Sequence, residues 1–593
     1  MISCSGGGAL AAGSTIPTAN VTVSLGTNVT SRLLGIGGVS NASEALLIID
    51  EAGASVAKGG TLVPLVPGFG PDAPQTLCST PQVGAGIGGC AEFANTVNGY
   101  PVAVSVAGGT TPAANVFSGL ASGNQVTFEG IPILAPVSAS TQRTFRITNV
   151  RANVSGLGGG GLAGTTQLLA SISISGSTSV PINNPVQIAG FIQAGLTTVL
   201  RNTNNTGNQS SGGAGFNQCN GLSSPSGVAI LQYTENFGTA FKTRVQPTAA
   251  YNGQSGSPVQ NVPGQIYNSE SNFVYTGAAG NGWTAGLADY GTRLKAVFNN
   301  IPAGVRIFVS VTNLAVNTTS PNTAAPTATS SSSYAVLVSS EAAPDSNGFL
   351  PVLTQTTGVN GTPATTGIVE LPQSGGSATA VWEVVNTNPN QQETLQFGVW
   401  TQYAASVATN SPAPGTATVN MSYAPTPTVP FSSSAGSAAS SSLTIPRFAD
   451  TSTAKNLLAV NICQTLLLFP FVTNQSGFDT GIAIANTSQD PIGTSTQAGT
   501  CTLTWYDGTG KEPAVTTGSI AAGTVYTTLA STSAAGFQGY MFALCNFQFA
   551  HGFAFISDLG ARNLAMGYLA LIINNNSNSN NRNQTITTES ANQ

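Results

Sequence analysis

The sequence has very few charged side chains. Only 6% of its 593 residues are Asp, Glu, Lys or Arg, against about 25% in an average soluble protein. The net charge of −5 is weak, so the chain has no basic surface of the kind that binds nucleic acid. Hydrophobic residues make up 41% of the chain, which is enough to form cores and excludes a disordered protein. Hydroxyl and amide groups must therefore cover the surface.

Residues that commonly carry catalysis or bind metals are also scarce. His551 is the single histidine, so a Ser-His-Asp triad or a transition-metal site would have to use it. Asp50 and Glu51 are adjacent at the end of an expected strand, where successive side chains point to opposite faces. This arrangement does not suit the facing carboxylates of a glycosidase. We therefore expect no enzyme activity, no catalytic residues, no cofactor and no metal site.

Long apolar runs and long amphipathic helices are absent from the sequence. No apolar run reaches the roughly 18 residues that a membrane-spanning helix needs. Short segments of alternating polarity instead follow one another, separated by Gly, Pro and Asn. Val21, Val23 and Leu25, for example, alternate with polar residues, which indicates a strand. The pattern predicts an all-β protein made of several antiparallel, Ig-like β-sandwich domains in tandem.

Shifts in composition suggest where these domains begin and end. The division that we predict is a flexible tether at 1–18, β-sandwich region 1 at 19–200, a linker at 201–226, β-sandwich region 2 at 227–345, β domain 3 at 346–424, a second linker at 425–445, a C-terminal β-sandwich module at 446–573 and a polar tail at 574–593.

Two parts of the chain resemble each other. VTFEGIP, TFRITNVRANV and LLASISISGS follow one another between residues 126 and 177. AVFNNIP, IFVSVTNLAVN and SYAVLVSSEA follow in the same order between residues 296 and 342. Three blocks in one order at a nearly constant offset predict two related domains.

The C-terminal module is the most apolar and aromatic part of the sequence. Phe547, Phe549, Phe553 and Phe555 lie two or four residues apart, so we expect them to share one face of a strand, with His551 on the opposite face or at a bend. In the preceding domain, Trp382 and Trp400 are the expected core anchors.

The seven cysteines indicate disulfides. No CxxC pair occurs, which disfavours a zinc or redox motif. Cys78 and Cys90 enclose a Gly-rich loop that a local bridge could close, and Cys501 and Cys545 lie in expected neighbouring strands. We predict both bridges, with Cys219 and Cys463 left as a long-range pair.

Cys4 is a candidate lipidation site. With the SGGGALAAGS segment that follows, it resembles the mature start of a bacterial lipoprotein, in which a lipidated cysteine precedes a flexible tether. The alternative is an incidental cysteine behind a misassigned start codon. No charged and apolar leader precedes it, so no intact secretion signal is visible.

Several long phrases resemble one protein family. FPFVTNQSGFDTGIAIANTS, GTCTLTWYDG and GFQGYMFALCNFQFAHGFAFISDLGARNLAMGYLAL look like the C-terminal module of uncharacterised secreted proteins typical of Acidobacteria. GTRLKAVFNNIPAGVRIFVSVTN, TAVWEVVNTNPNQQETLQFGVW and the VTFEGIP segment resemble the rest of those proteins. The resemblance covers most of residues 20–573 and implies an exported, β-rich bacterial surface protein. It transfers no activity and no catalytic residues.

Two functions fit these observations. The first is an extracellular structural protein that assembles with copies of itself, head to tail, into a filament, sheath or surface layer, because a surface with little charge carries little mutual repulsion. The second is a monomeric cell-surface adhesin or carbohydrate-binding protein, for which Trp283, Tyr403 and Trp505 are the candidate aromatic platforms. In both cases we expect a secreted or cell-surface protein without a transmembrane segment.

For the first function, we predict a strand that joins one subunit to the next. Asn20, Val21, Val23 and Leu25 belong to a strand behind the predicted tether, so this strand could pair with the sheet of a neighbouring subunit by β-augmentation. The C-terminal QTITTE segment (584–589) is a weaker candidate. The alternative is that the strand pairs within its own domain.

Overall fold

The structure is a computed structural model of the chain, and nearly all of its regular elements are strands. None of the helices it describes is long and apolar enough to cross a membrane. The described residues are 1–5, 17–50, 76–86, 88–90, 96–97, 100–101, 114–133, 142–158, 166–176, 180–218, 221–242, 275, 285–286, 288–314, 333–341, 367–387, 391–403, 412–426, 438–492, 494, 496–511 and 513–573.

The first domain is built from an eight-stranded sheet in the order β1-β8-β3-β6-β7-β2-β9-β10. Its hydrophobic cluster joins Leu47 of β3 and Phe145 of β8 to Val23 of β2 and Phe128 of β7, so the sheet folds around one core. The strands are β1 (Ile2–Ser5), β2 (Thr18–Leu25), β3 (Ala42–Ile49), β6 (Val116–Ser122), β7 (Gln125–Pro132), β8 (Gln142–Thr148), β9 (Thr166–Gly176) and β10 (Val186–Ile192), with a separate pair β4 (Thr96–Val97) and β5 (Tyr100–Pro101) and two 3-10 turns at Ile36–Gly38 and Val154–Leu157.

The middle domain is a sandwich of two sheets, in the orders β11-β13-β19-β15-β17 and β12-β21-β20-β14-β18-β16. Trp382 stacks on Phe397 of the facing sheet at 4.1 Å between ring centroids and donates to the Ser310 carbonyl at 2.9 Å. The strands are β11 (Leu196–Arg201), β12 (Ala214–Asn217), β13 (Leu222–Glu235), β14 (Arg293–Asn299), β15 (Arg306–Ser310), β16 (Tyr334–Val338), β17 (Ile368–Glu370), β18 (Ala378–Asn386), β19 (Thr394–Tyr403), β20 (Gly415–Ala424) and β21 (Lys455–Asn461).

The C-terminal module is a second sandwich, in which Leu467, Ile484, Leu503 and Ala554 share one core. One sheet has the order β25-β24-β28-β22-β31, with β26 beside β24, and the other has the order β27-β23-β29-β30. The elements are β22 (Thr465–Thr473), β23 (Asp479–Asn486), β24 (Cys501–Asp507), β25 (Gly510–Lys511), β26 (Val515–Thr516), β27 (Val525–Leu529), α1 (Ala530–Ser533), β28 (Gln538–Cys545), β29 (Ala550–Ser557), β30 (Ala565–Leu569) and β31 (Leu571–Ile573).

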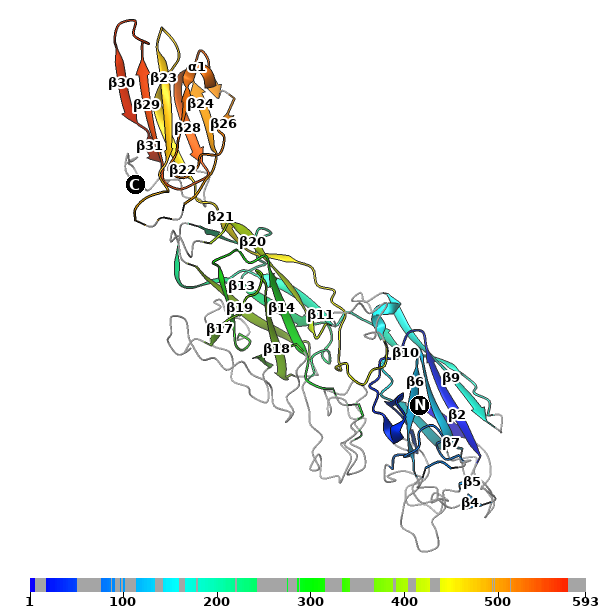
Figure 1. Cartoon of the computed structure of the whole chain (residues 1–593). Coiled ribbons are helices and arrows are strands. Elements are labelled where there is room, and N and C mark those ends of the chain that lie inside the picture. The colour runs from blue at the N-terminus through cyan, green and yellow to red at the C-terminus, as the bar shows by residue number, and fades with distance from the viewer. Residues whose placement is uncertain are drawn as a thin grey trace.

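The fold class predicted from the sequence is confirmed: the chain is all-β, with separate sheets in successive bodies whose strands pair antiparallel, except for β12 and β21 (Figure 1). The predicted repeat also has a local structural parallel. Gly130 and Asn300 occupy matching positions in the first block of each copy, and both have a positive φ, of 59° and 55°. Ile131 and Ile301 follow them, and both side chains are buried.

The sheets divide the chain differently from the predicted boundaries. Region 2 and domain 3 form one sandwich, because β13 pairs with β19 and β14 pairs with both β18 and β20. The predicted linker 201–226 contains β12 and the start of β13. β21 (455–461) pairs with β20 of the middle sandwich, not with the C-terminal module. Pairing between distant strands decides these boundaries, and composition does not reveal it. The polar tail lies outside the described residues.

Charged groups connect the first domain to the middle domain. Glu44 is fully buried and accepts hydrogen bonds from Arg151 Nε at 2.6 Å and from the Gly286 amide at 2.9 Å. Arg32 forms an ion pair with Asp289 at 2.7 Å. Part of the predicted linker 425–445 lies at the same junction, where the Ser440 carbonyl accepts from the Leu33 amide at 2.9 Å. Specific polar contacts therefore fix this junction.

The middle sandwich also encloses an ion pair. Arg293 and Glu383 are directly opposite each other on β14 and β18, and both side chains are fully buried. Arg293 Nη2 lies 2.8 Å from Glu383 Oε2, the Gly291 amide donates to Glu383 Oε1 at 2.9 Å, and the guanidinium covers the Tyr290 ring at 4.0 Å. The ion pair therefore neutralises two charges that water does not reach.

We expect Glu383→Gln to lower the free energy of unfolding of the middle sandwich by about 3 kcal/mol, because it leaves a buried guanidinium without its counter-charge. The matched control is Glu370→Gln. Glu370 pairs with Arg306 on the surface, with side chains 41% and 44% exposed, so its loss should cost less than about 1 kcal/mol. Urea unfolding followed by tryptophan fluorescence measures both. Equal effects of the two substitutions would contradict this account.

Candidate assembly surfaces

The strand predicted to join subunits lies in the interior of its own sheet. β2 contains Asn20, Val21, Val23 and Leu25, and it pairs with β7 on one side and β9 on the other. Val21, Val23 and Leu25 are buried in the first core. The structure therefore shows the alternative, pairing within the domain. Alternation identified the buried face, but it does not distinguish a central strand from an edge strand. The QTITTE segment lies outside the described residues.

Cys4 belongs to a short edge strand. β1 pairs with β8, with Cys4 opposite Arg143, so residues 2–5 of the predicted tether are ordered as a strand. Cys4 carries a free thiol that is half-buried against the first core. Burial raises the pKa of this thiol, and the nearby Arg143 partly offsets the increase. Lipidation of Cys4 stays a prediction.

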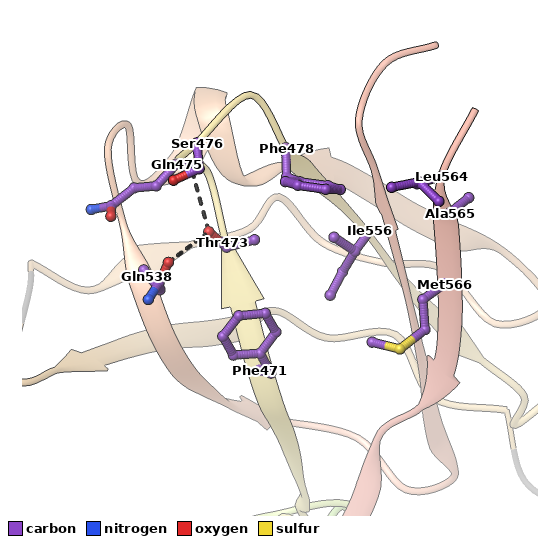
Figure 2. A pocket seen from close by; sticks show the side chains of 10 residues that line it. All are labelled: Phe471, Thr473, Gln475, Ser476, Phe478, Gln538, Ile556, Leu564, Ala565 and Met566. Carbon is purple, nitrogen blue, oxygen red and sulfur yellow. Dashed lines mark hydrogen bonds between the residues drawn. The ribbon is translucent and has the colours of Figure 1, made fainter. Parts of the chain in front are cut away.

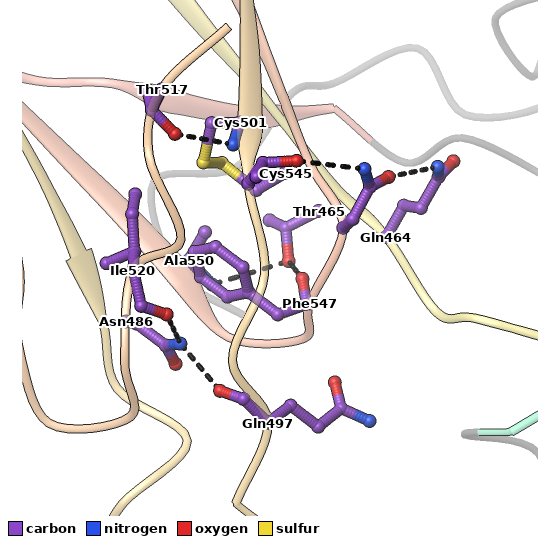
Figure 3. The surroundings of a disulfide bond; sticks show 12 residues. Gln464, Thr465, Asn486, Gln497, Cys501, Thr517, Ile520, Cys545, Phe547 and Ala550 are labelled. Carbon is purple, nitrogen blue, oxygen red and sulfur yellow. Dashed lines mark hydrogen bonds between the residues drawn. A yellow bond between two sulfur atoms is a disulfide. The ribbon is translucent and has the colours of Figure 1, made fainter. Parts of the chain in front are cut away.

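Both predicted local cysteine pairs are bonded in the structure. Cys78 and Cys90 form a disulfide with a Cα–Cα distance of 5.2 Å. Cys501 and Cys545 lie directly opposite each other on β24 and β28, with a Cα–Cα distance of 3.9 Å (Figure 3). Cys463 is disulfide-bonded as well. Its predicted partner, Cys219, lies outside the described residues.

Hydrogen bonds hold the chain on both sides of the Cys501–Cys545 bridge. The Cys501 amide donates to Thr517 Oγ1 at 2.9 Å, and Thr465 Oγ1 donates to the Phe547 carbonyl at 3.0 Å (Figure 3). Asn486 Nδ2 donates to the carbonyls of Gln497 and Ile520, at 2.7 and 3.0 Å. Side-chain hydrogen bonds thus hold the segments that surround the bridge.

Two of the three aromatic residues proposed as binding platforms are not on the surface. Tyr403 and Trp505 are buried, and Trp283 lies outside the described residues. Trp382 and Trp400 are buried as expected, although on different faces: Trp382 belongs to the main core, and Trp400 packs with Phe308 and Ile368 in a small separate cluster. Burial fits the core role of these rings and removes Tyr403 and Trp505 as platforms.

The phenylalanines of the C-terminal module do not share one face. Phe547 is buried, whereas Phe553 and Phe555 are exposed on β29. His551 lies on the same exposed face as these two rings, not on the opposite one. The strand is interrupted before it reaches them, because Phe549 has a φ of 59° between β28 and β29. After this turn, the residues that point outward are those that would have pointed inward in a continuous strand. Counting residues along the sequence does not reveal this change.

The four-stranded sheet of the module consequently has an apolar outer face. Every second residue of β23 points to this face, and three of these residues are small: Gly481, Ala483 and Ala485. The neighbouring strands raise larger side chains on both sides of this row, and the exposed hydrophobic ones are Val525 (58%), Leu529 (48%), Phe553 (42%), Phe555 (46%) and Leu569 (59%). Thr527, His551, Ser557, Ala565 and Gly567 complete the face. Asp479, at the start of β23, lies on the same side of the strand, but it is only 5% exposed and accepts hydrogen bonds from the amide and the hydroxyl of Ser531. No exposed residue of the face is Asp, Glu, Lys or Arg.

A second uncharged surface lies on the first domain. β10 is an edge strand that pairs only with β9, and neither strand contains a charged residue. Ile188 is opposite Leu169 in the ladder, and both side chains are about half exposed, as are Val186 and Phe191. Edge strands usually carry charges that discourage pairing with another sheet. β17 of the middle sandwich has such a charge in Glu370, and β10 does not.

A pocket of about 340 Å³ lies between residues of the two sheets of the C-terminal module (Figure 2). Phe471, Phe478, Ile556 and Met566 supply apolar walls from both sheets, and Thr473, Gln475 and Gln538 contribute hydroxyl and amide groups. No side chain that lines it is charged. The pocket therefore suits an apolar group, not an ion.

Side chains close the strand edge beside this pocket. The Tyr568 hydroxyl donates to the Phe471 carbonyl. Thr480 Oγ1 donates to the Thr473 carbonyl at 2.8 Å and accepts from the Thr473 amide at 3.0 Å. Burial raises the pKa of Tyr568 to about 12, and its hydrogen bond to the Phe471 carbonyl partly offsets the increase. With Pro470 supplying no amide hydrogen, this edge is poorly suited to receiving another strand.

Within the described ranges, no three His, Cys, Asp or Glu side chains come together as a metal site. His551 is opposite Ala485 on the outer face, in the same row as Phe553 and Phe555. The candidate binding surfaces among the described residues are therefore the apolar ones: the outer face of the C-terminal sheet, β10 and the pocket.

Replacing both Cys501 and Cys545 by serine should lower the free energy of unfolding of the C-terminal module by about 2–4 kcal/mol, because the bridge closes a loop of 44 residues. Trp505 is the one tryptophan of this module, so its fluorescence during urea unfolding reports the change. Cys4→Ser is the control and should leave the same transition where it was. Unchanged stability of the double variant would remove the structural role that we assign to the bridge.

The chain matches no protein-family model, and no curated protein matches it.

Proposed function

We propose that this chain is an extracellular structural protein whose copies assemble with one another into a filament, sheath or surface layer. One observation carries the proposal: the two end domains expose apolar sheet surfaces without exposed charged residues, β10 in the first domain and the outer face of the β27-β23-β29-β30 sheet in the last. Such surfaces are typical of association sites. The disulfides favour an oxidising compartment outside the cytoplasm.

An apolar surface at each end suits an extended assembly. A protein with one such surface stops at a dimer, whereas a protein with two separate surfaces can continue in both directions. The bodies follow one another along the chain (Figure 1), so contacts at the first and last would leave the middle sandwich between them. The resemblance to secreted acidobacterial proteins supports the same setting. A catalytic constellation plays no part in this function.

The full-length protein should form oligomers whose mass rises with concentration, and 0.5 M NaCl should not dissolve them, because burial of apolar surface is not screened by salt. Multi-angle light scattering and negative-stain microscopy measure this. A protein that stays monomeric up to millimolar concentration would contradict the proposed function.

Ile188→Lys should shorten these assemblies, because it places a charge on the open edge at β10. Ile188 is about half exposed, so the folded domain accommodates the lysine. Thr416→Lys is the matched control, since Thr416 is exposed on β20 of the middle sandwich. If both variants assembled like the wild type, β10 would not be a contact.

A glycan-binding adhesin is the second candidate, and one observation favours it. Tyr506 and Tyr540 stack at 5.4 Å on the outer face of the disulfide-linked sheet, and Phe542 meets both rings edge-on. Tyr540 is 42% exposed, and exposed rings with a hydroxyl suit the apolar face and the hydroxyls of a sugar.

Tyr540→Ala should abolish retention on a polysaccharide or glycan array if this second function holds, whereas Tyr568→Phe, which is a change elsewhere in the module, should not. Retention that is equal in wild type and Tyr540→Ala, or absent from both, would reject it.

A further inference from the structure

The outer face of the β27-β23-β29-β30 sheet is shaped in ridges and a valley. Gly481, Ala483 and Ala485 of β23 form the valley. His551, Phe553 and Phe555 of β29 form a ridge on one side, and Val525, Thr527 and Leu529 of β27 form a lower ridge on the other. Because the strands are in register, Phe553 is level with Ala483, and Phe555 is level with Gly481.

Contacts on the sheet fix the positions of these rings. A Cβ at Gly567 would lie 2.7 Å from Phe553 Cζ, so the Phe553 ring leans over β30 at the place where it has no side chain. Diagonal packing of an aromatic ring on a strand glycine stabilises the ring in a sheet. The ring therefore stands beside the valley and does not fill it.

We propose that this face binds the same face of a second copy of the chain, through a twofold axis parallel to the strands. Such an axis, placed between β23 and β29, puts β23 of one copy opposite β29 of the other copy, and β29 of the first opposite β23 of the second. The ridge of each copy then enters the valley of its partner, with Phe553 against Ala483 and Phe555 against Gly481. A twofold axis perpendicular to the strands would place ridge against ridge.

Charge and size both fit a second copy as the occupant. The exposed residues of the face carry no charge, and Asp479 at its end is already buried and hydrogen-bonded by Ser531, so two copies meet without burying a further ion. Four strands of five to eight residues, at about 3.3 Å per residue and about 4.8 Å between strands, give roughly 400 Å² of projected surface per copy. Two copies bury at least about 800 Å², the size of a weak specific contact.

This inference rests on the proposed function and specifies one of its contacts. It replaces the head-to-tail contact expected from the sequence, because the strand Asn20–Leu25 is held inside its own sheet. A symmetric contact at the last domain, combined with a second contact at the first, still produces a chain of subunits.

The test uses full-length protein in which Ile188→Lys blocks the other proposed contact at β10, and adds one of three substitutions to this parent, which takes the place of the wild type in the comparison. Ala483→Glu places a carboxylate in the valley, and Phe553→Lys places an ammonium on the ridge. Each should weaken dimerisation at least tenfold in sedimentation velocity. Thr504→Glu is the matched control on the outer face of the other sheet of this module, and it should dimerise like the parent. Circular dichroism and Trp505 fluorescence verify that each variant is folded.

Mixing the two charged variants tests the register. In a mixed dimer the carboxylate introduced in the valley of one copy would face the ammonium introduced on the ridge of the other, while one native pair of Phe553 and Ala483 remains. The mixture should therefore recover dimers that neither variant forms alone. Dimers of Ala483→Glu as strong as those of the parent, or a mixture that stays monomeric, would overturn the contact.

The proposed function fails separately from this contact. If wild-type protein assembles and Ala483→Glu assembles equally, the contact is wrong and assembly stands. If the wild type is monomeric at every concentration, assembly itself is wrong. Binding of wild type, but not of Ala483→Glu, to phosphatidylcholine vesicles in place of dimerisation would identify a lipid surface as the occupant and would also overturn the proposal.

Discussion

The surface of this protein has few charges for two reasons. The sequence contains few charged residues, and several of these are buried in ion pairs. Arg143 with Asp50, Arg293 with Glu383, and Arg151 with Glu44 are ion pairs whose acidic side chains are completely buried. A buried pair must be complete, since either partner alone is strongly destabilising. These pairs hold neighbouring strands together, and Glu44 also contributes to the junction of the first two domains. They also remove charges from a surface that has few to begin with.

The surfaces of the end domains follow from this distribution. Natural sheets discourage unwanted pairing with charged residues at their edges and faces, and this sequence uses polar but neutral residues in their place. The edge of β22 beside the pocket is protected in another way. The side chains of Tyr568 and Thr480 form hydrogen bonds with backbone groups of β22 that another strand would otherwise pair with. β10 and the outer face at β23 and β29 have neither exposed charges nor such side-chain hydrogen bonds to protect them. The contrast within one module is the reason to regard the exposed face as functional.

Local patterns in the sequence predicted local features of the structure. Alternation at Val21, Val23 and Leu25 identified a strand and its buried face, and the spacing of Cys78 and Cys90 pointed to a bridge. Features that depend on distant partners were missed. Nothing near residue 214 indicates that β12 pairs with β21, and nothing near residue 20 indicates two neighbours for β2. The exposed face was missed for a local reason, the positive φ of Phe549, which alternation does not detect.

The pairing of β12 with β21 has a consequence for biogenesis. These strands are parallel neighbours, with Ala214 opposite Leu458, so one sheet of the middle sandwich cannot be completed until the chain has been made to residue 461. Synthesis proceeds at about 5–20 residues per second, which leaves β12 without its partner for roughly 12–50 seconds. During that interval, strands with almost no charge have open edges. A cell that makes this protein must therefore keep the unfinished chains apart.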